Sequence, residues 1–131
     1  MPSQPHQPKA EPPRTEAIPG YQVISKIGVG GMAVVFKAVE IKTRRTVALK
    51  ILLPKTVQNP VLLKRFKREA ELLSKFQHEN IVKGYHYGSV SGLYFLAMEY
   101  IEGKSVQELI DKKGVLQEDL ALNIIIQVAR A

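Results

Sequence analysis

The chain contains no cysteine and no tryptophan, and nothing in it resembles a long hydrophobic run. Without cysteine it can form neither a disulfide nor a thiolate metal site. No apolar stretch is long enough to cross a bilayer as a helix, and the N-terminus lacks the pattern of a signal peptide. His78 and His86 have no Cys or carboxylate at metal-ligand spacing, so we expect no metal site. These absences together predict a cytoplasmic protein without a membrane segment.

Acidic residues are scarce, and the formal net charge is +7. Residues 37–68 carry ten Lys or Arg against the single carboxylate of Glu40. Such a basic stretch could bind nucleic acid or an acidic membrane surface. However, it has no interleaved aromatic residues on which bases could stack. We therefore expect a solvated surface that helps to attract phosphate groups, and no nucleic-acid partner.

Proline is concentrated at the N-terminus, where residues 1–19 hold six of the eight prolines and almost no apolar side chains. Such a composition cannot bury enough surface to offset the entropy of ordering, which predicts a disordered or polyproline-II tail. A proline motif that binds an adaptor is the alternative. The remaining residues, 20–131, are enough for one domain at most.

A region of alternating strands and one helix follows the tail. Strands are predicted at residues 21–28, 33–40, 45–52, 81–88 and 93–99. Asn59 and Pro60 are typical of the start of a helix, which we expect over residues 60–76. Its apolar positions recur at helical spacing: Leu63, Phe66, Ala70 and Leu73. The predicted fold class is α+β, a five-stranded antiparallel sheet with one packed helix over residues 20–103.

The sequence pattern becomes helical beyond Gly103. Ser105 and Glu108 form a capping-box pattern that predicts a helix over residues 106–112, and another helix is expected from Leu116 onward. Eight of the ten residues from Leu120 to Ala129 are apolar. A helix that is apolar nearly all round belongs inside a larger body.

A glycine-rich turn, a lysine and a glutamate occur at a spacing that suggests a nucleotide site. The turn reads Gly28-Val29-Gly30-Gly31-Met32-Ala33, and Lys50 follows on an apolar strand. Glu69 lies on the predicted helix. Glycines let backbone N–H groups approach phosphate oxygens, and they permit the left-handed dihedrals that a tight turn can need.

The same glycine pattern could open a dinucleotide-binding unit, which needs a helix directly after the turn. The residues that follow, 33–39, are instead β-branched and aromatic, and a polar turn and a second apolar strand come next. A glycine turn between two strands argues against the dinucleotide interpretation.

From about Tyr21 to the last residue, the chain resembles a protein kinase, most closely the bacterial, eukaryotic-like (Hanks-type) serine/threonine kinases. Residues 47–50 are similar to the strand lysine motif, 68–70 to part of the helix that kinases call αC, 78–82 to the start of the next strand, and 98–101 to the gatekeeper and hinge. The resemblance implies a kinase N-lobe over residues 20–103 and the first helices of an α-helical C-lobe over 104–131.

The resemblance also implies ligands and site residues. ATP would be the nucleotide, with Mg²⁺, and proteins would be the substrates. Lys50 would contact the α- and β-phosphates, and Glu69 would hold it by an ion pair. Met98 would be the gatekeeper. The hinge carbonyl of Glu99 and the amide of Ile101 would bind the adenine edge. Ile27, Val35 and Ala48 would sandwich the adenine, and the phosphates would be covered by Gly28, Val29, Gly30, Gly31, Met32 and Ala33.

Each of these residues also has a purely structural interpretation. Lys50 could be an ordinary lysine at a strand end, and Glu69 could pair with Arg65 on its own helix. Val35 and Ala48 would suit a core whether or not ATP binds. The joint occurrence of turn, lysine, glutamate and hinge favours the nucleotide site.

The sequence departs from the kinase pattern because it contains no H-R-D-x-x-x-x-N, D-F-G or A-P-E motif. No residue here matches the family's catalytic aspartate or its magnesium ligands, so we expect a truncated kinase that is inactive alone. The alternative is a non-catalytic kinase-like lobe that regulates a partner. The apolar helix from Leu120 to Ala129 favours truncation, since a free-standing lobe would leave large side chains in water. Preference for serine and threonine over tyrosine rests on the resemblance.

Overall fold

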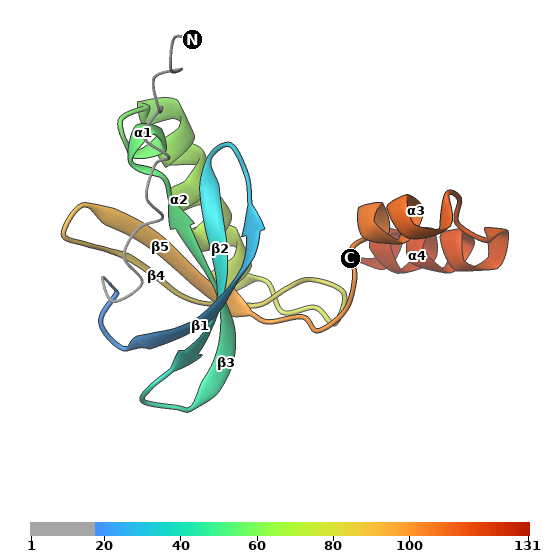
Figure 1. Cartoon of the computed structure of the whole chain (residues 1–131), viewed down its shortest axis with the longest axis horizontal. Coiled ribbons are helices and arrows are strands. Elements are labelled where there is room, and N and C mark those ends of the chain that lie inside the picture. The colour runs from blue at the N-terminus through green and yellow to red at the C-terminus, as the bar shows by residue number, and fades with distance from the viewer. Residues whose placement is uncertain (1–17) are drawn as a thin grey trace, which may run out of the picture.

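The computed structural model describes residues 18–131. Figure 1 shows a strongly twisted sheet with a long helix, α2, behind it and a pair of helices, α3 and α4, set apart beside it. The strands are β1 (Tyr21–Val29), β2 (Ala33–Glu40), β3 (Arg45–Leu52), β4 (Gly84–Val90) and β5 (Leu93–Glu99). The helices are α1 (Pro54–Val57), α2 (Pro60–Lys75), α3 (Val106–Lys113) and α4 (Glu118–Arg130).

The five strands form one antiparallel sheet in the order β1-β2-β3-β5-β4. This confirms the predicted fold class. Tight turns connect the hairpins, and the β4–β5 turn has positive φ at Ser91 (49°) and Gly92 (81°). Positive φ at both central residues matches the right-handed twist of the flanking strands.

The predicted start of the fourth strand is wrong. That strand was expected from residue 81, but β4 begins at Gly84, and the helix expected to residue 76 ends at Lys75. The backbone N–H of Asn80 donates to Nδ1 of His78 (3.0 Å), and the N–H of Ile81 donates to the carbonyl of His78 (3.1 Å). These local bonds hold residues 78–81 in a turn, in competition with pairing in the sheet.

The two faces of the sheet bury different clusters, because side chains alternate along a strand. In β3, Val47, Leu49 and Ile51 join a cluster with Phe36, Phe95 and Ala97. On the opposite face Leu52 and Leu96 pack against α2 through Phe66 and Ala70. Ile18 belongs to the first cluster and is only 2% exposed, so the core includes a residue two positions before the predicted domain start at residue 20. The rest of the predicted tail, residues 1–17, lies outside the described residues.

Helix α2 begins and packs as its sequence predicts. The side-chain oxygen of Asn59 accepts from the N–H groups of Val61 (3.1 Å) and Leu62 (3.4 Å), and Pro60 occupies the first turn. Phe66 and Ala70 are buried, with Leu63 and Leu73 packed at the edge of the same cluster. The helix therefore lies across the face of the sheet that also carries the even-numbered residues of β3.

Helices α3 and α4 follow the sheet as a separate hairpin (Figure 1). The predicted capping box is present: the Glu108 N–H donates to Ser105 Oγ (3.1 Å), and the Ser105 N–H donates back to Glu108 Oε2 (2.9 Å). No residue of α4 is buried, and its apolar side chains Leu122, Ile125 and Val128 are more than half exposed. Across residues 18–131, none of the helices combines the length and the apolar character that a bilayer crossing demands.

Candidate nucleotide-binding site

The sheet brings most of the predicted site residues onto one face. Directly paired residues of an antiparallel sheet point to the same side. Val35 pairs with Lys50, and Ala48 pairs with Met98. Gly28 pairs with Val35 across β1 and β2. Since Lys50 and Ala48 share the face that α2 covers, the predicted phosphate and adenine contacts lie on that face.

Two strand residues of the predicted site are exceptions. Val29 pairs with Val34, which packs in the cluster on the opposite face. The other is Ile27. It falls in the register shift between Lys26 and Gly28, where β1 is irregular, and its side chain is about half exposed. A register shift locally re-aims a strand. Its contribution to an adenine sandwich therefore stays a prediction.

The amine of Lys50 is held by a partner from α2. Its Nζ lies 3.2 Å from Oε1 and 3.4 Å from Oε2 of Glu69. The alternative pairing of Glu69 with Arg65 does not occur among the described residues. Lys50 lies within β3, and Glu69 lies on α2, which packs on the sheet. The ammonium is therefore held between two rigid elements. Some of the lysine remains accessible, with 23% of its side chain exposed.

The glycine-rich turn joins β1 to β2 through residues 30–32. The N–H of Gly30 donates to the carbonyl of Ala33 (2.9 Å), which closes the turn. The expectation of left-handed dihedrals is wrong here, since none of the glycines 28, 30 and 31 has positive φ. A Cβ would meet only ordinary contacts at Gly28 and Gly30 and open space at Gly31. The fold itself therefore does not require glycine at these positions, and the backbone of the turn is open there.

The predicted hinge leaves β5 at Glu99 and continues into irregular chain. The N–H of Glu99 donates to the Lys83 carbonyl (2.8 Å), and its carboxylate accepts from the Lys83 N–H (3.2 Å). Ile101 is exposed, and no hydrogen bond from its N–H occurs among residues 18–131. Within the described part of the chain, the amide expected to bind the adenine edge therefore has no acceptor.

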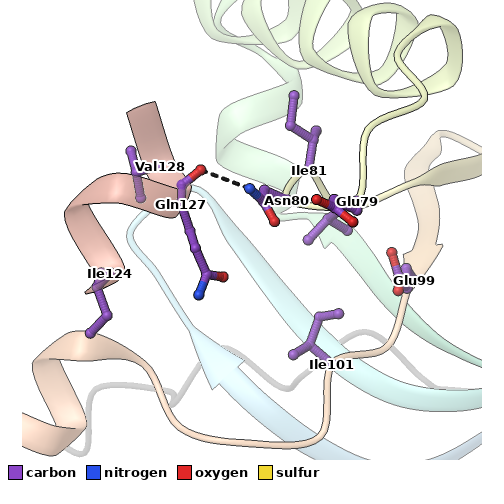
Figure 2. Close-up of a pocket in the computed structure, with 9 residues that line it drawn as sticks. Glu79, Asn80, Ile81, Glu99, Ile101, Ile124, Gln127 and Val128 are labelled. Carbon is purple, nitrogen blue, oxygen red and sulfur yellow. Dashed lines mark hydrogen bonds between the residues drawn. The ribbon is translucent and has the colours of Figure 1, made fainter. Parts of the chain in front are cut away.

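A cavity of about 350 Å³ lies between the hinge and α4 (Figure 2). Across it, Asn80 Nδ2 donates to the backbone carbonyl of Gln127 (2.9 Å), as the dashed line in Figure 2 shows. Glu99 and Ile101 line it together with Glu79, Ile81, Val82, Ile124 and Val128. The Asn80 hydrogen bond is a contact that the sequence did not indicate, since a backbone acceptor leaves no trace in the residue pattern.

Two further contacts were also missed. Helix α1 was not predicted, and its Thr56 hydroxyl donates to the Met32 carbonyl in the glycine turn (2.8 Å). Near the hinge, Lys37 Nζ lies 4.8 Å from the ring centroid of Tyr100, within cation–π range. No side chain caps α1, so a capping pattern could not have indicated the helix that carries Thr56.

No group of three or more potential metal ligands occurs within residues 18–131. Three features of the candidate site lie around one face of the sheet. They are the glycine-rich turn, the lysine paired with a residue of α2, and the exposed hinge amide. This arrangement is typical of the N-terminal lobe of a protein kinase.

Comparison with known proteins agrees with that class. The family model described as "Protein kinase domain" matches residues 21–131. The serine/threonine-protein kinase PrkC of Bacillus subtilis is 40% identical over 111 residues, which are 85% of this chain and 17% of that protein. PknD of Mycobacterium tuberculosis is 34% identical over the same share of this chain and 17% of its own length. The chain belongs to the protein kinase family, among relatives that are bacterial serine/threonine kinases.

The solved kinase domain of PknI from Mycobacterium tuberculosis has the same fold. It superposes with a TM-score of 0.72 at 28% identity, over 85% of this chain and 46% of the PknI chain. The chain thus spans less than half of a kinase domain and about a sixth of the curated relatives' length. The match includes the N-lobe sheet, α2 and the start of the helical region, as the resemblance implied.

Proposed function

We propose that this chain is the ATP-binding portion of a serine/threonine protein kinase. The complete domain would transfer the γ-phosphoryl group of ATP to hydroxyl groups of protein substrates in the cytoplasm. The observation that carries the proposal is the Lys50–Glu69 ion pair, 3.2 Å long, on the sheet face that the glycine turn borders. Membership of the kinase family supports it, since phosphoryl transfer depends mainly on positioning and charge stabilisation.

In this proposal, the chain's own residues bind and orient the nucleotide. The backbone N–H groups of residues 28–33 cover the phosphates, and Lys50 places a positive charge at the α- and β-phosphates. The ion pair with Glu69 restrains the ammonium, which would otherwise move freely in solvent. At the other end of the face, the Glu99 carbonyl and the Ile101 N–H bind the adenine edge, with Met98 as gatekeeper and Val35 and Ala48 against the ring.

Magnesium would accompany the nucleotide and neutralise charge on its phosphates. The described residues offer no three-ligand cluster of their own for it. The sequence also contains no H-R-D or D-F-G motif. We therefore expect that the 131-residue chain binds Mg·ATP weakly and transfers no phosphoryl group.

The test is an NMR titration of the isotope-labelled chain with Mg·ATP, which detects weak binding. We expect saturable shifts of amides in residues 28–33 and 98–101, and a several-fold weaker affinity for Lys50→Ala. Lys42→Ala is the matched control, because Lys42 is exposed in the β2–β3 turn. The absence of saturable shifts at these amides, or equal losses in the two variants, would contradict the proposal.

A separate assay addresses catalysis. Incubation of the purified chain with γ-labelled ATP and a generic protein acceptor is expected to yield no labelled protein. Label incorporated by this chain, and lost in Lys50→Ala, would show that the catalytic group lies within these residues.

A further inference from the structure

Thr56 is the one buried polar side chain among residues 18–131, with an exposed fraction of 2%. It belongs to α1, directly after β3, and its hydroxyl donates to the backbone carbonyl of Met32 over 2.8 Å. The N–H of Leu53 donates to the same oxygen over 3.0 Å. The Met32 carbonyl thus accepts two hydrogen bonds from one segment that lies far from it in the sequence.

Within the glycine-rich turn, Met32 is the last residue before β2 begins. Its side chain is about half exposed, whereas its carbonyl is held against the protein. Glycines make the preceding backbone flexible, since they have more conformational freedom to lose than other residues. Only the bond from Gly30 to Ala33 closes the turn internally. The contact with Thr56 and Leu53 therefore fixes the end of a segment that would otherwise move.

The carbonyl and the following N–H of a planar trans peptide point in opposite directions. Fixing the Met32 carbonyl therefore also fixes the direction of the Ala33 N–H, which belongs to the segment predicted to cover the phosphates. A carbonyl dipole turned toward a triphosphate would repel it. Held by Thr56 and Leu53, the Met32 carbonyl is kept on the protein side.

We propose that Thr56 is a positioning residue for the phosphate-binding turn. It acts through the Met32 carbonyl and does not touch the nucleotide. The inference rests on the proposed ATP site and adds to it a determinant of triphosphate affinity that lies outside the glycine motif. A purely stabilising role for Thr56 would affect all ligands alike, which makes the two roles separable.

The experiment compares the affinities of the 131-residue chain for Mg·ATP and for adenosine, measured by NMR titration. Thr56→Val keeps the shape of the side chain and removes the donor. We expect it to weaken Mg·ATP binding about three- to tenfold, the loss of one hydrogen bond, and to leave adenosine binding unchanged. Thr56→Ser restores the donor and is expected to restore the Mg·ATP affinity. Thr46→Val, at an exposed position of β3, is the matched control and should change neither affinity.

The ratio of the two affinities is the decisive quantity, because partial unfolding of a variant lowers both affinities by the same factor. An unchanged ratio in Thr56→Val, or a ratio that serine does not restore, overturns the inference. If such a result appears while Lys50→Ala still weakens Mg·ATP binding, the proposed ATP site stands and only the role of Thr56 falls. A wild-type chain that binds neither ligand overturns both.

Discussion

Lys50 on β3 and Glu69 on α2 form an ion pair of 3.2 Å across the boundary between the sheet and its covering helix. Both side chains are partly exposed, 23% for Lys50 and 46% for Glu69. Exposed pairs of this kind contribute only about 0–1 kcal/mol to stability. The pair therefore adds little to the stability of the fold, which agrees with the binding role proposed for the Lys50 ammonium.

Glu69→Gln should separate binding from stability. We expect the unfolding temperature to change by no more than a few degrees, because the pair contributes about 1 kcal/mol at most. Mg·ATP affinity should fall several-fold, since the ammonium loses the partner that directs it. Glu71→Gln on the same helix is the control and should alter neither. A large drop in unfolding temperature with unchanged Mg·ATP affinity would show that the pair serves the fold.

Gly31→Ala should leave the fold intact and weaken triphosphate binding. A Cβ at Gly31 has no atom within 4 Å, and its φ is not positive, so the variant should match the wild type in thermal unfolding. The added methyl group would lie on the turn that a phosphate must approach. Titration with Mg·ATP and with adenosine should show a loss for the first ligand only. An equal loss for both ligands would contradict phosphate binding by this turn.

Gly84→Ala, unlike Gly31→Ala, is expected to destabilise the fold. A Cβ there would lie 3.0 Å from the Cβ of Leu73 and 3.1 Å from its backbone carbonyl carbon, where β4 begins beneath α2. Because backbone must shift to relieve the contact, we expect a loss of about 1–3 kcal/mol in the free energy of unfolding. Chemical denaturation measures it. Stability equal to that of Gly31→Ala would mean that α2 can move away from the sheet without cost.

Phe66→Ala should be the most destabilising of these changes. Phe66 is 4% exposed and packs with Ala70, Leu52 and Leu96 between α2 and the sheet. Truncating a buried phenylalanine leaves a cavity and costs about 3–5 kcal/mol. Denaturant unfolding should show this loss. Val61→Ala, at an exposed position of the same helix, is the control and should cost far less.

Glu40 links stability to acid pH. A hydrogen bond from the Thr43 hydroxyl (2.8 Å) lowers the pKa of its carboxyl below the ordinary 4.5, and Arg45 lowers it further through a hydrogen bond and its charge. A pKa that is lower in the folded state stabilises the fold above the unfolded value, and this stabilisation is lost as the pH falls through the folded value. Glu40→Gln should therefore lower the unfolding temperature at neutral pH, with a difference that shrinks in acid. If the unfolding temperatures of Glu40→Gln and the wild type differ by the same amount at neutral and acid pH, the linkage is contradicted.

Local patterns predicted the elements whose causes are local. The cap at Asn59, the capping box of Ser105 and Glu108, and the alternation of β3 each depend on neighbours within a few residues. The start of β4 was mispredicted because an apolar run at residues 81–82 reads as a strand. The turn at His78 and the close approach of Gly84 to Leu73 determine where pairing begins.

The sequence by itself determined the number of strands and their succession along the chain. It also determined the main helix and the types of residue that a kinase nucleotide site uses. The motif pattern favoured a pair between Lys50 and Glu69, with Arg65 as the alternative partner of Glu69. Only the packing of α2 on the sheet decided that Glu69 pairs with Lys50. A salt bridge needs two side chains close together, and the distance between these two depends on tertiary contacts. The same holds for Thr56 and Met32, whose bond joins a hydroxyl to a backbone carbonyl that no residue pattern reveals.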